Sequence, residues 1–155
     1  QNFLLSNASL ETINDIVALL ELRISLESEA VFLASERRKQ VHIDQMKAAL
    51  NDFEMHISSG ENDGTVKADY DFHIAIAEAS ANQYFVDFLK YLGEKIIPRA
   101  RVKSIEQSPE NREEYLKAVH HDHVNIFNAI VDQDGLLARQ MMRAHLSKSI
   151  KKFKQ

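Results

Sequence analysis

The chain has 155 residues, of which 45% are hydrophobic and 27% are charged, so it is large enough for one domain with a buried core and too short for two. Its four glycines and two prolines provide few of the tight turns that an all-β fold needs, and the lack of cysteine excludes disulfides and thiolate metal sites. The net charge of −4, from 19 basic and 23 acidic residues, offers no overall positive field for nucleic acid, so this chain alone is not expected to bind DNA.

The sequence shows no targeting or membrane signal. Its apolar runs fall far short of the roughly 18 to 20 residues that cross a bilayer, and the amino terminus lacks a charged region followed by an apolar one. We therefore expect a cytoplasmic protein that does not enter a membrane. Because the chain begins with Gln rather than Met, we also expect a fragment or a processed product.

Apolar residues recur at three- and four-residue spacing over most of the chain, which predicts helices. In chain order, the predicted helices cover about Leu10–Arg38, His42–Ser58, Val66–Ser80, Tyr84–Ile96, Glu110–Asp132 and Leu136 to near the carboxyl end. Residues 61–64 are expected to form a turn, Pro98 to end or bend the fourth helix, and Pro109 to lie at the start of the fifth. Short connections between six helices predict an all-α, antiparallel bundle.

The first predicted helix carries Arg23, which is the only basic residue among the first 35 and lies among leucines. A guanidinium that points inward requires an anion, because burying an unpaired charge is very costly. Two anions are open: Glu27, four residues further along the helix, or the carboxylate of a small ligand held by two parallel hydrogen bonds.

The third predicted helix places Asp69 and His73 four residues apart, one turn from each other on a face that continues through Ile76 and Ala77. Two side chains in this arrangement can reach one metal ion. An Asp and a His at this spacing more often form only a hydrogen-bonded surface pair, so the spacing alone does not predict a metal site.

His123 and His145 lie on the apolar stripes of the last two predicted helices, eleven residues before and after position 134, where the connecting turn is centred. Antiparallel helices joined there would place both imidazoles at one height. Together with Asp69 and His73 they offer three imidazoles and one carboxylate, a set that suits Zn²⁺, Ni²⁺, Co²⁺, Mn²⁺ or Fe²⁺.

The remaining histidines fit this set less well. His120 competes with His123 because it lies near apolar residues, whereas His121 aligns with polar residues and is expected to be solvated. His42 and His56 have no comparable neighbours and are expected at the surface. The sequence also lacks a phosphate-binding glycine loop and a Gly-x-Ser-x-Gly nucleophile elbow, which argues against common enzyme classes.

Taken together, these residues resemble the effector-binding (FCD) domain of GntR-type transcriptional regulators of the FadR subfamily. The resemblance extends from about Leu10 to Ser149. It is carried by Leu19, Glu21-Leu22-Arg23, Leu26-Glu27 and Ala30, by Asp69-x-x-Phe72-His73-x-x-Ile76-Ala77 with Ala79-Ser80-x-Asn82, by Asp122-His123-x-x-Ile126-x-x-Ala129-Ile130, and by Ala138-x-x-Met141-x-x-x-His145-Leu146.

The resemblance implies residues 1–9 as a linker remnant and residues 10–155 as a helical ligand-sensing domain with a central pocket. The amino-terminal winged helix-turn-helix that would contact DNA is absent from this chain, and a homodimer is expected. The matching positions of the metal-binding branch are Asp69, His73, His123 and His145, with Zn²⁺ or Ni²⁺ favoured over Mn²⁺, Co²⁺ and Fe²⁺. This ligand set argues against the acyl-CoA-binding branch.

Arg23 and Asn82 match family positions for contact with the effector, which we expect to be a small carboxylate, hydroxy acid or sugar acid. The implied function is binding without turnover. Two other functions stay open: a mononuclear His/Asp metalloenzyme that acts on a small acid, and a helical interaction module whose histidines are merely packed.

Overall fold

The computed structural model describes residues 13–60, 62–95 and 109–154, and this part of the chain contains six helices and no strand. The helices are α1 (Ile13–Arg37), α2 (Gln40–Ser59), α3 (Asn62–Ala79), α4 (Gln83–Lys95), α6 (Pro109–Val131) and α7 (Gly135–Lys154). The prediction of an all-α bundle is confirmed. None of the described helices is long and apolar enough to span a membrane.

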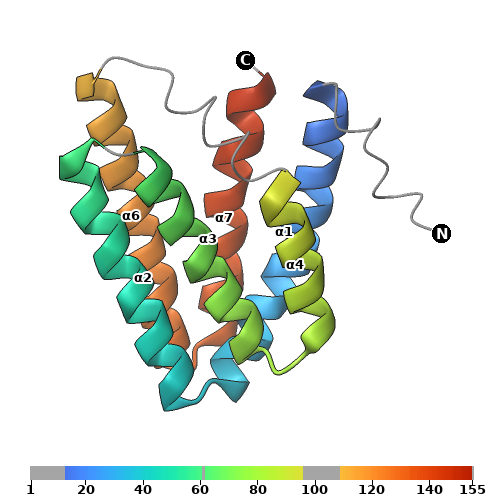
Figure 1. The fold of residues 1–155 in the computed structure, drawn as a ribbon. Coiled ribbons are helices and arrows are strands. Elements are labelled where there is room, and N and C mark those ends of the chain that lie inside the picture. The colour runs from blue at the N-terminus through green and yellow to red at the C-terminus, as the bar shows by residue number, and fades with distance from the viewer. Residues whose placement is uncertain (1–12, 61, 96–108, 155) are drawn as a thin grey trace.

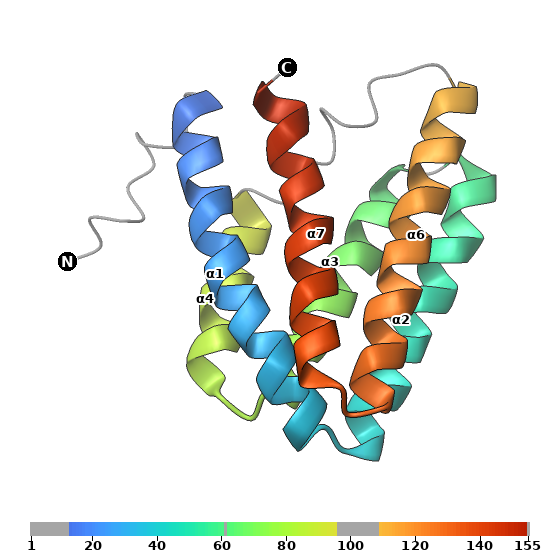
Figure 2. The same ribbon diagram turned by 180° about the vertical axis from the view of Figure 1, so that it is seen from behind.

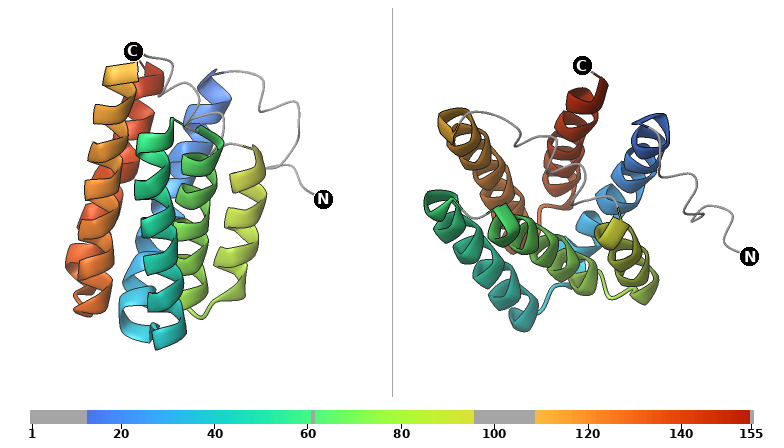
Figure 3. Two further views of the ribbon diagram at one scale, coloured as in Figure 1. Left: turned by 60° about the vertical axis from the view of Figure 1, so that its left-hand side comes forward. Right: turned by 45° about the horizontal axis from the view of Figure 1, so that its top comes forward.

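Successive helices run up and down, and they form two layers of three (Figures 1 and 2). One layer contains α2, α3 and α4, with α3 in the middle, and the other contains α1, α7 and α6, with α7 in the middle. The layers are joined where α2 packs on α6 and where α3 packs on α1 (Figure 3). The faces of α3 and α7 that point inward therefore lie in the centre of the bundle.

Large apolar side chains from both layers fill the space between them. Val31 of α1, Phe72 of α3, Ile126 of α6 and Met142 of α7 are all buried in one continuous core. Each fully buried side chain of this size contributes roughly 1.5 to 3 kcal/mol to folding. This core fixes how the helices are rotated, and hence which polar side chains are forced to the inside.

Two arginines at the end of α1 connect the helix ends. Arg38 donates hydrogen bonds to the carbonyl oxygens of Ile130 and Val131 at the end of α6, and Arg37 donates one to the carbonyl of Ser80 after α3. The last carbonyls of a helix have no partner within the helix, so these contacts supply hydrogen-bond donors there. The carbonyl of Ile130 also accepts a hydrogen bond from the Gln133 amide. The two arginines hold α1 against both α3 and α6.

A tight turn joins α6 to α7. The backbone of Gln133 is left-handed, with φ 57°, and the side chain of Asp134 accepts a hydrogen bond from the Leu137 amide at 3.1 Å, which caps α7. Because the connection is short and capped, the register of α6 against α7 is fixed from this point onward.

The expectation of a turn over residues 61–64 is wrong for residues 62–64. Gly60, with φ 76°, ends α2, and α3 begins at Asn62, so residues 62–64 form its first turn. Gly64 stands inside the helix because a Cβ there would lie 2.2 Å from the ring of His56 on α2. The glycine allows α2 and α3 to approach closely, which its turn-forming tendency does not reveal. Residues 1–9 and Pro98, on which two of the expectations fall, lie outside the described residues.

Candidate metal centre

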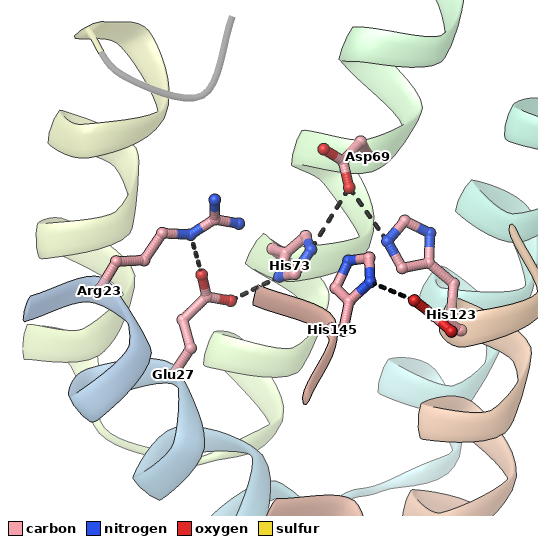
Figure 4. A network of polar contacts seen from close by, with 7 residues as sticks. Arg23, Glu27, Asp69, His73, His123 and His145 are labelled. Carbon is pink, nitrogen blue, oxygen red and sulfur yellow. Dashed lines mark hydrogen bonds and ion pairs between the residues drawn. The ribbon is translucent and has the colours of Figure 1, made fainter. Parts of the chain in front are cut away.

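Four buried side chains from three helices converge in the middle of the bundle. Asp69 and His73 come from α3, His123 from α6 and His145 from α7, and one potential ligand atom of each lies within 4.8 Å of all the others. Figure 4 shows the three imidazoles and the carboxylate pointing toward one another. The structure thus brings together all four residues that the sequence proposed as metal ligands.

The α6–α7 turn accounts for the meeting of two of the imidazoles. The ring centroids of His123 and His145 lie 4.8 Å apart, as expected for residues equally distant from the turn. The ring centroid of His73 lies 5.5 Å from that of His123 and 6.1 Å from that of His145. A register set near residue 134 therefore positions side chains eleven residues away on both helices.

The ring nitrogens that face the centre match what a metal ion needs. Nε2 of His73 and Nε2 of His123 lie 3.3 and 3.1 Å from Oδ1 of Asp69, yet both nitrogens are buried and make no hydrogen bond of acceptable geometry. Buried polar atoms normally have partners, so such atoms are candidates for an ion or ligand. Ligand atoms around a tetrahedral zinc ion lie roughly 3.4 Å apart, so the most distant pair in the cluster would have to approach by about 1.4 Å to bind one ion.

A buried carboxylate supports His73 from behind. Oε1 of Glu27 lies 2.5 Å from Nδ1 of His73, and Oε2 accepts a hydrogen bond from Nε of Arg23. Burial alone would raise the pKa of Glu27, but Arg23 and His73 outweigh it and hold the pKa at about 2. In Figure 4 the two terminal nitrogens of Arg23 point away from Glu27. Of the two anions that the sequence leaves open for Arg23, Glu27 is therefore the one that it contacts in the structure.

A second carboxylate supports His145 nearer the surface. Oδ2 of Asp122 lies 2.9 Å from Nδ1 of His145 and 2.9 Å from Nζ of Lys148. Hydrogen bonds from His145 and Lys148 overcome the effect of burial and lower the pKa of Asp122 to about 2. A cavity of about 220 Å³ between α6 and α7 is lined by Asp122, His145 and Lys148, among others.

The electrostatics of the cluster favour neutral imidazole at two positions. Burial lowers the pKa of His123 to about 3 and also lowers the pKa of His145. Burial acts in the same direction on His73, but Glu27 and Asp69 outweigh it and raise the pKa of His73. A metal ion binds only the deprotonated nitrogen, so His123 and His145 are ready to bind without losing a proton.

Comparison with known proteins assigns the fold to a family. The model of the FCD domain matches residues 18–148. The chain belongs to the FCD domain family.

One relative supports this assignment, and one solved structure shares the fold. The chain is 30% identical to the HTH-type transcriptional regulator LutR of Bacillus subtilis (strain 168) over 152 residues. This match covers 92% of this chain and 64% of LutR. A solved structure of Lar, described as controlling the agr system of Listeria monocytogenes and mediating virulence, superimposes with a TM-score of 0.77 at 12% identity, over 92% of this chain and 64% of that one. The second likeness concerns the fold alone. This FCD domain spans less than two thirds of either protein.

The other histidines of the FCD domain lie outside the cluster. His120 stacks on Phe53, with its Nε2 3.5 Å from Glu54, and His121 is exposed, as the sequence predicts. His42 accepts a hydrogen bond from the Lys39 amide, and His56 contacts the carbonyl of Asp52. His123, rather than His120, therefore faces the centre.

Asn82 has a structural role at a helix end. It lies in the turn between α3 and α4, where its side-chain oxygen accepts a hydrogen bond from the Tyr84 amide at 3.0 Å and caps α4. It follows His73 by nine residues, which is roughly 13 Å along a helix. Its contact with an effector stays a prediction.

Sequence reasoning missed the roles of Glu27 and Asp122 toward the imidazoles. Glu27 and His73 are 46 residues apart on helices whose relative register no local pattern reveals. Asp122 gave a usable signal, because it directly precedes His123 and must lie close to the height of His145 across the hairpin.

Proposed function

We propose that this FCD domain binds one divalent transition-metal ion through Asp69, His73, His123 and His145, and that it senses a small organic acid there. The observation that carries the proposal is the buried convergence of three imidazoles and one carboxylate within 4.8 Å. Zn²⁺ and Ni²⁺ are favoured, with Mn²⁺, Co²⁺ and Fe²⁺ as alternatives, because the donors are nitrogen and oxygen without sulfur.

The nature of the effector follows from charge. A bound divalent ion would supply a Lewis-acidic centre that attracts an anionic oxygen. Arg23 adds a buried guanidinium whose terminal nitrogens are directed away from Glu27 (Figure 4). A planar guanidinium suits a carboxylate, so a small carboxylate, hydroxy acid or sugar acid is the class we propose.

The proposed output is a change in DNA binding by a part of the protein outside this chain. The relative LutR is named as a transcriptional regulator, which supports a regulatory role for the FCD domain. An effector can transmit a signal only if it binds one arrangement of the protein better than another. We propose that the two arrangements are those of a homodimer of the full-length protein.

Binding without turnover fits the cluster better than hydrolysis. Among the described residues, the two carboxylates that contact its imidazoles from behind are already engaged, Glu27 with Arg23 and Asp122 with Lys148. Neither is placed as a general base at the centre of the cluster. Sustained conversion of an ester, a lactone or a sugar acid by the metal-loaded domain would replace sensing with catalysis as the function.

The direct test is a thermal-shift screen of the zinc-loaded domain against small carboxylic, hydroxy and sugar acids. An acid present at about 100 times its dissociation constant adds about 2.7 kcal/mol of stability. We expect this shift for at least one acid and no shift for the corresponding alcohol. If no acid stabilises the zinc-loaded domain, the proposed effector class is wrong.

A further inference from the structure

We infer that Glu27 is a positioning residue of the metal site: its buried carboxylate determines which nitrogen of His73 faces the ion. The inference deepens the proposed function and rests on it, because it assumes that His73 binds a metal. It also gives Arg23 a task besides effector binding, which is to keep this carboxylate charged inside the protein.

The contacts of Glu27 leave its carboxylate no freedom. One oxygen lies 2.5 Å from Nδ1 of His73, the other accepts from Nε of Arg23, and the side chain is 1% exposed. Figure 4 shows the carboxylate lying between the guanidinium and the imidazole. Both of its oxygens are thus used, one toward each neighbour.

The contact with Glu27 defines the state of His73. An ionised carboxylate can only accept a hydrogen bond, so Nδ1 of His73 must carry a proton. The other nitrogen, Nε2, then faces Asp69 and His123 and is the one that can bind a metal. Without a fixed acceptor at Nδ1, the proton could reside on Nε2 and block metal binding.

Arg23 makes this arrangement possible in the interior. A buried carboxylate without a compensating charge would take up a proton or force a rearrangement. Arg23 lies one helical turn before Glu27 on α1 and is itself buried. Its positive charge therefore compensates the negative charge of Glu27 inside the protein. The packing of α1 on α3 places this ion pair next to His73.

The test compares zinc affinity in the wild-type domain and in Glu27→Gln. Glutamine has the same shape, but it has one oxygen and one NH₂ group, so one of the two neighbours must face a donor instead of an acceptor. We expect zinc to bind about 10 to 100 times more weakly, as is typical when the hydrogen-bond partner of a ligating histidine is removed.

Glu29→Gln is the matched control. It removes one negative charge from the same helix, but Glu29 is 52% exposed and its contact is to Arg139. We expect its zinc affinity to remain within about twofold of wild type, because an exposed charge acts weakly through solvent.

A spectroscopic measurement separates positioning from a general loss of structure. In the zinc-loaded, ¹⁵N-labelled wild-type domain, the proton on Nδ1 of His73 should give a downfield resonance, because it forms a hydrogen bond to the carboxylate of Glu27. In Glu27→Gln at saturating zinc, this resonance should move upfield. In Asp122→Asn, the His73 resonance should stay and that of His145 should move instead.

The double variant R23M/E27Q addresses the possibility that Glu27→Gln alone folds poorly around an unpaired arginine. Both charges are removed together, so the net charge equals that of the wild type. We expect zinc still to bind at least about tenfold more weakly than in wild type, since His73 still lacks its carboxylate. Wild-type affinity in Glu27→Gln or in the double variant, or an unmoved His73 resonance, would overturn the inference. A wild-type domain that takes up no zinc would instead refute the proposed function.

Discussion

Two short chains of polar contacts reach the histidine cluster from different helices. In each of them a positively charged side chain contacts a carboxylate, which in turn contacts an imidazole. The inner chain consists of Arg23, Glu27 and His73. The outer chain consists of Lys148, Asp122 and His145. All three members of the inner chain are buried, whereas Lys148 at the end of the outer chain is 63% exposed.

The comparison shows that one chemical pattern serves two purposes according to its burial. In the inner chain every charge depends on its neighbour, because no water replaces a lost contact. In the outer chain Asp122 keeps access to solvent and lines a cavity, so the contact to Lys148 is weak and replaceable. The inner chain therefore holds its imidazole in a fixed position, whereas the outer chain tolerates substitution of its exposed lysine.

The largest expected effect comes from removing the imidazole at the end of either chain. His73→Ala and His145→Ala should each abolish tight zinc binding, so that zinc at about 1,000 times the wild-type dissociation constant no longer adds its roughly 4 kcal/mol of stability. Thermal unfolding with and without zinc measures this difference. His121→Ala, at an exposed position, should leave it unchanged.

The same two variants should differ when metal is absent. His73→Ala leaves an oxygen of Glu27 buried without a partner, at a cost of about 1 to 3 kcal/mol, whereas in His145→Ala the carboxylate of Asp122 keeps Lys148. Equal stability of the two metal-free variants would contradict the distinction between the inner and outer chains.

The next effect concerns the basic ends of the two chains. Arg23→Met breaks a buried ion pair and should lower the free energy of unfolding of the metal-free domain by about 3 to 5 kcal/mol. Lys148→Met breaks an exposed pair and should cost less than about 1 kcal/mol. Urea unfolding of both variants checks this. If Lys148→Met costs as much as Arg23→Met, burial does not distinguish the chains.

The last comparison concerns the acid range. The pKa values of Glu27 and Asp122 are both lowered to about 2, from ordinary values of 4.5 and 3.8. Groups with a lowered pKa stabilise the fold above their unfolded value, and this stability is lost as the pH falls through the folded value. The unfolding free energy of the metal-free domain should therefore fall between about pH 4.5 and pH 2.

Replacement of either carboxylate should reduce this dependence on pH. Glu27→Gln should reduce the slope more than Asp122→Asn, because Asp122 is partly exposed to solvent. Urea titrations at several acidic pH values measure both slopes, with Asp44→Asn, at an exposed helix position, as the control. A slope unaffected by either change would show that neither carboxylate is stabilised in the fold.

Much of the fold could be predicted, because helical periodicity survives wherever a helix has one apolar face. The helix ends were harder. The start of α3 lies at Asn62 rather than near Val66, since Gly64 accommodates the ring of His56 instead of forming a turn. Local sequence shows a glycine, and only the packing of α2 on α3 shows why it is there.

The site divides in the same way. The meeting of His123 and His145 could be predicted because a short turn links their helices and fixes their register. The contact of Glu27 with His73 could not, because it depends on how α1 packs across the bundle on α3. Contacts between elements far apart in the chain carry no local signature.

The central claim is that side chains from three helices bind a single ion. The most direct test is the zinc stoichiometry of the wild-type domain and of His123→Ala, measured after equilibrium dialysis. We predict about one equivalent of zinc in the wild type and less than about a tenth of an equivalent in His123→Ala. Less than about a tenth of an equivalent in the wild type, for nickel as well as zinc, would show that the histidines are merely packed.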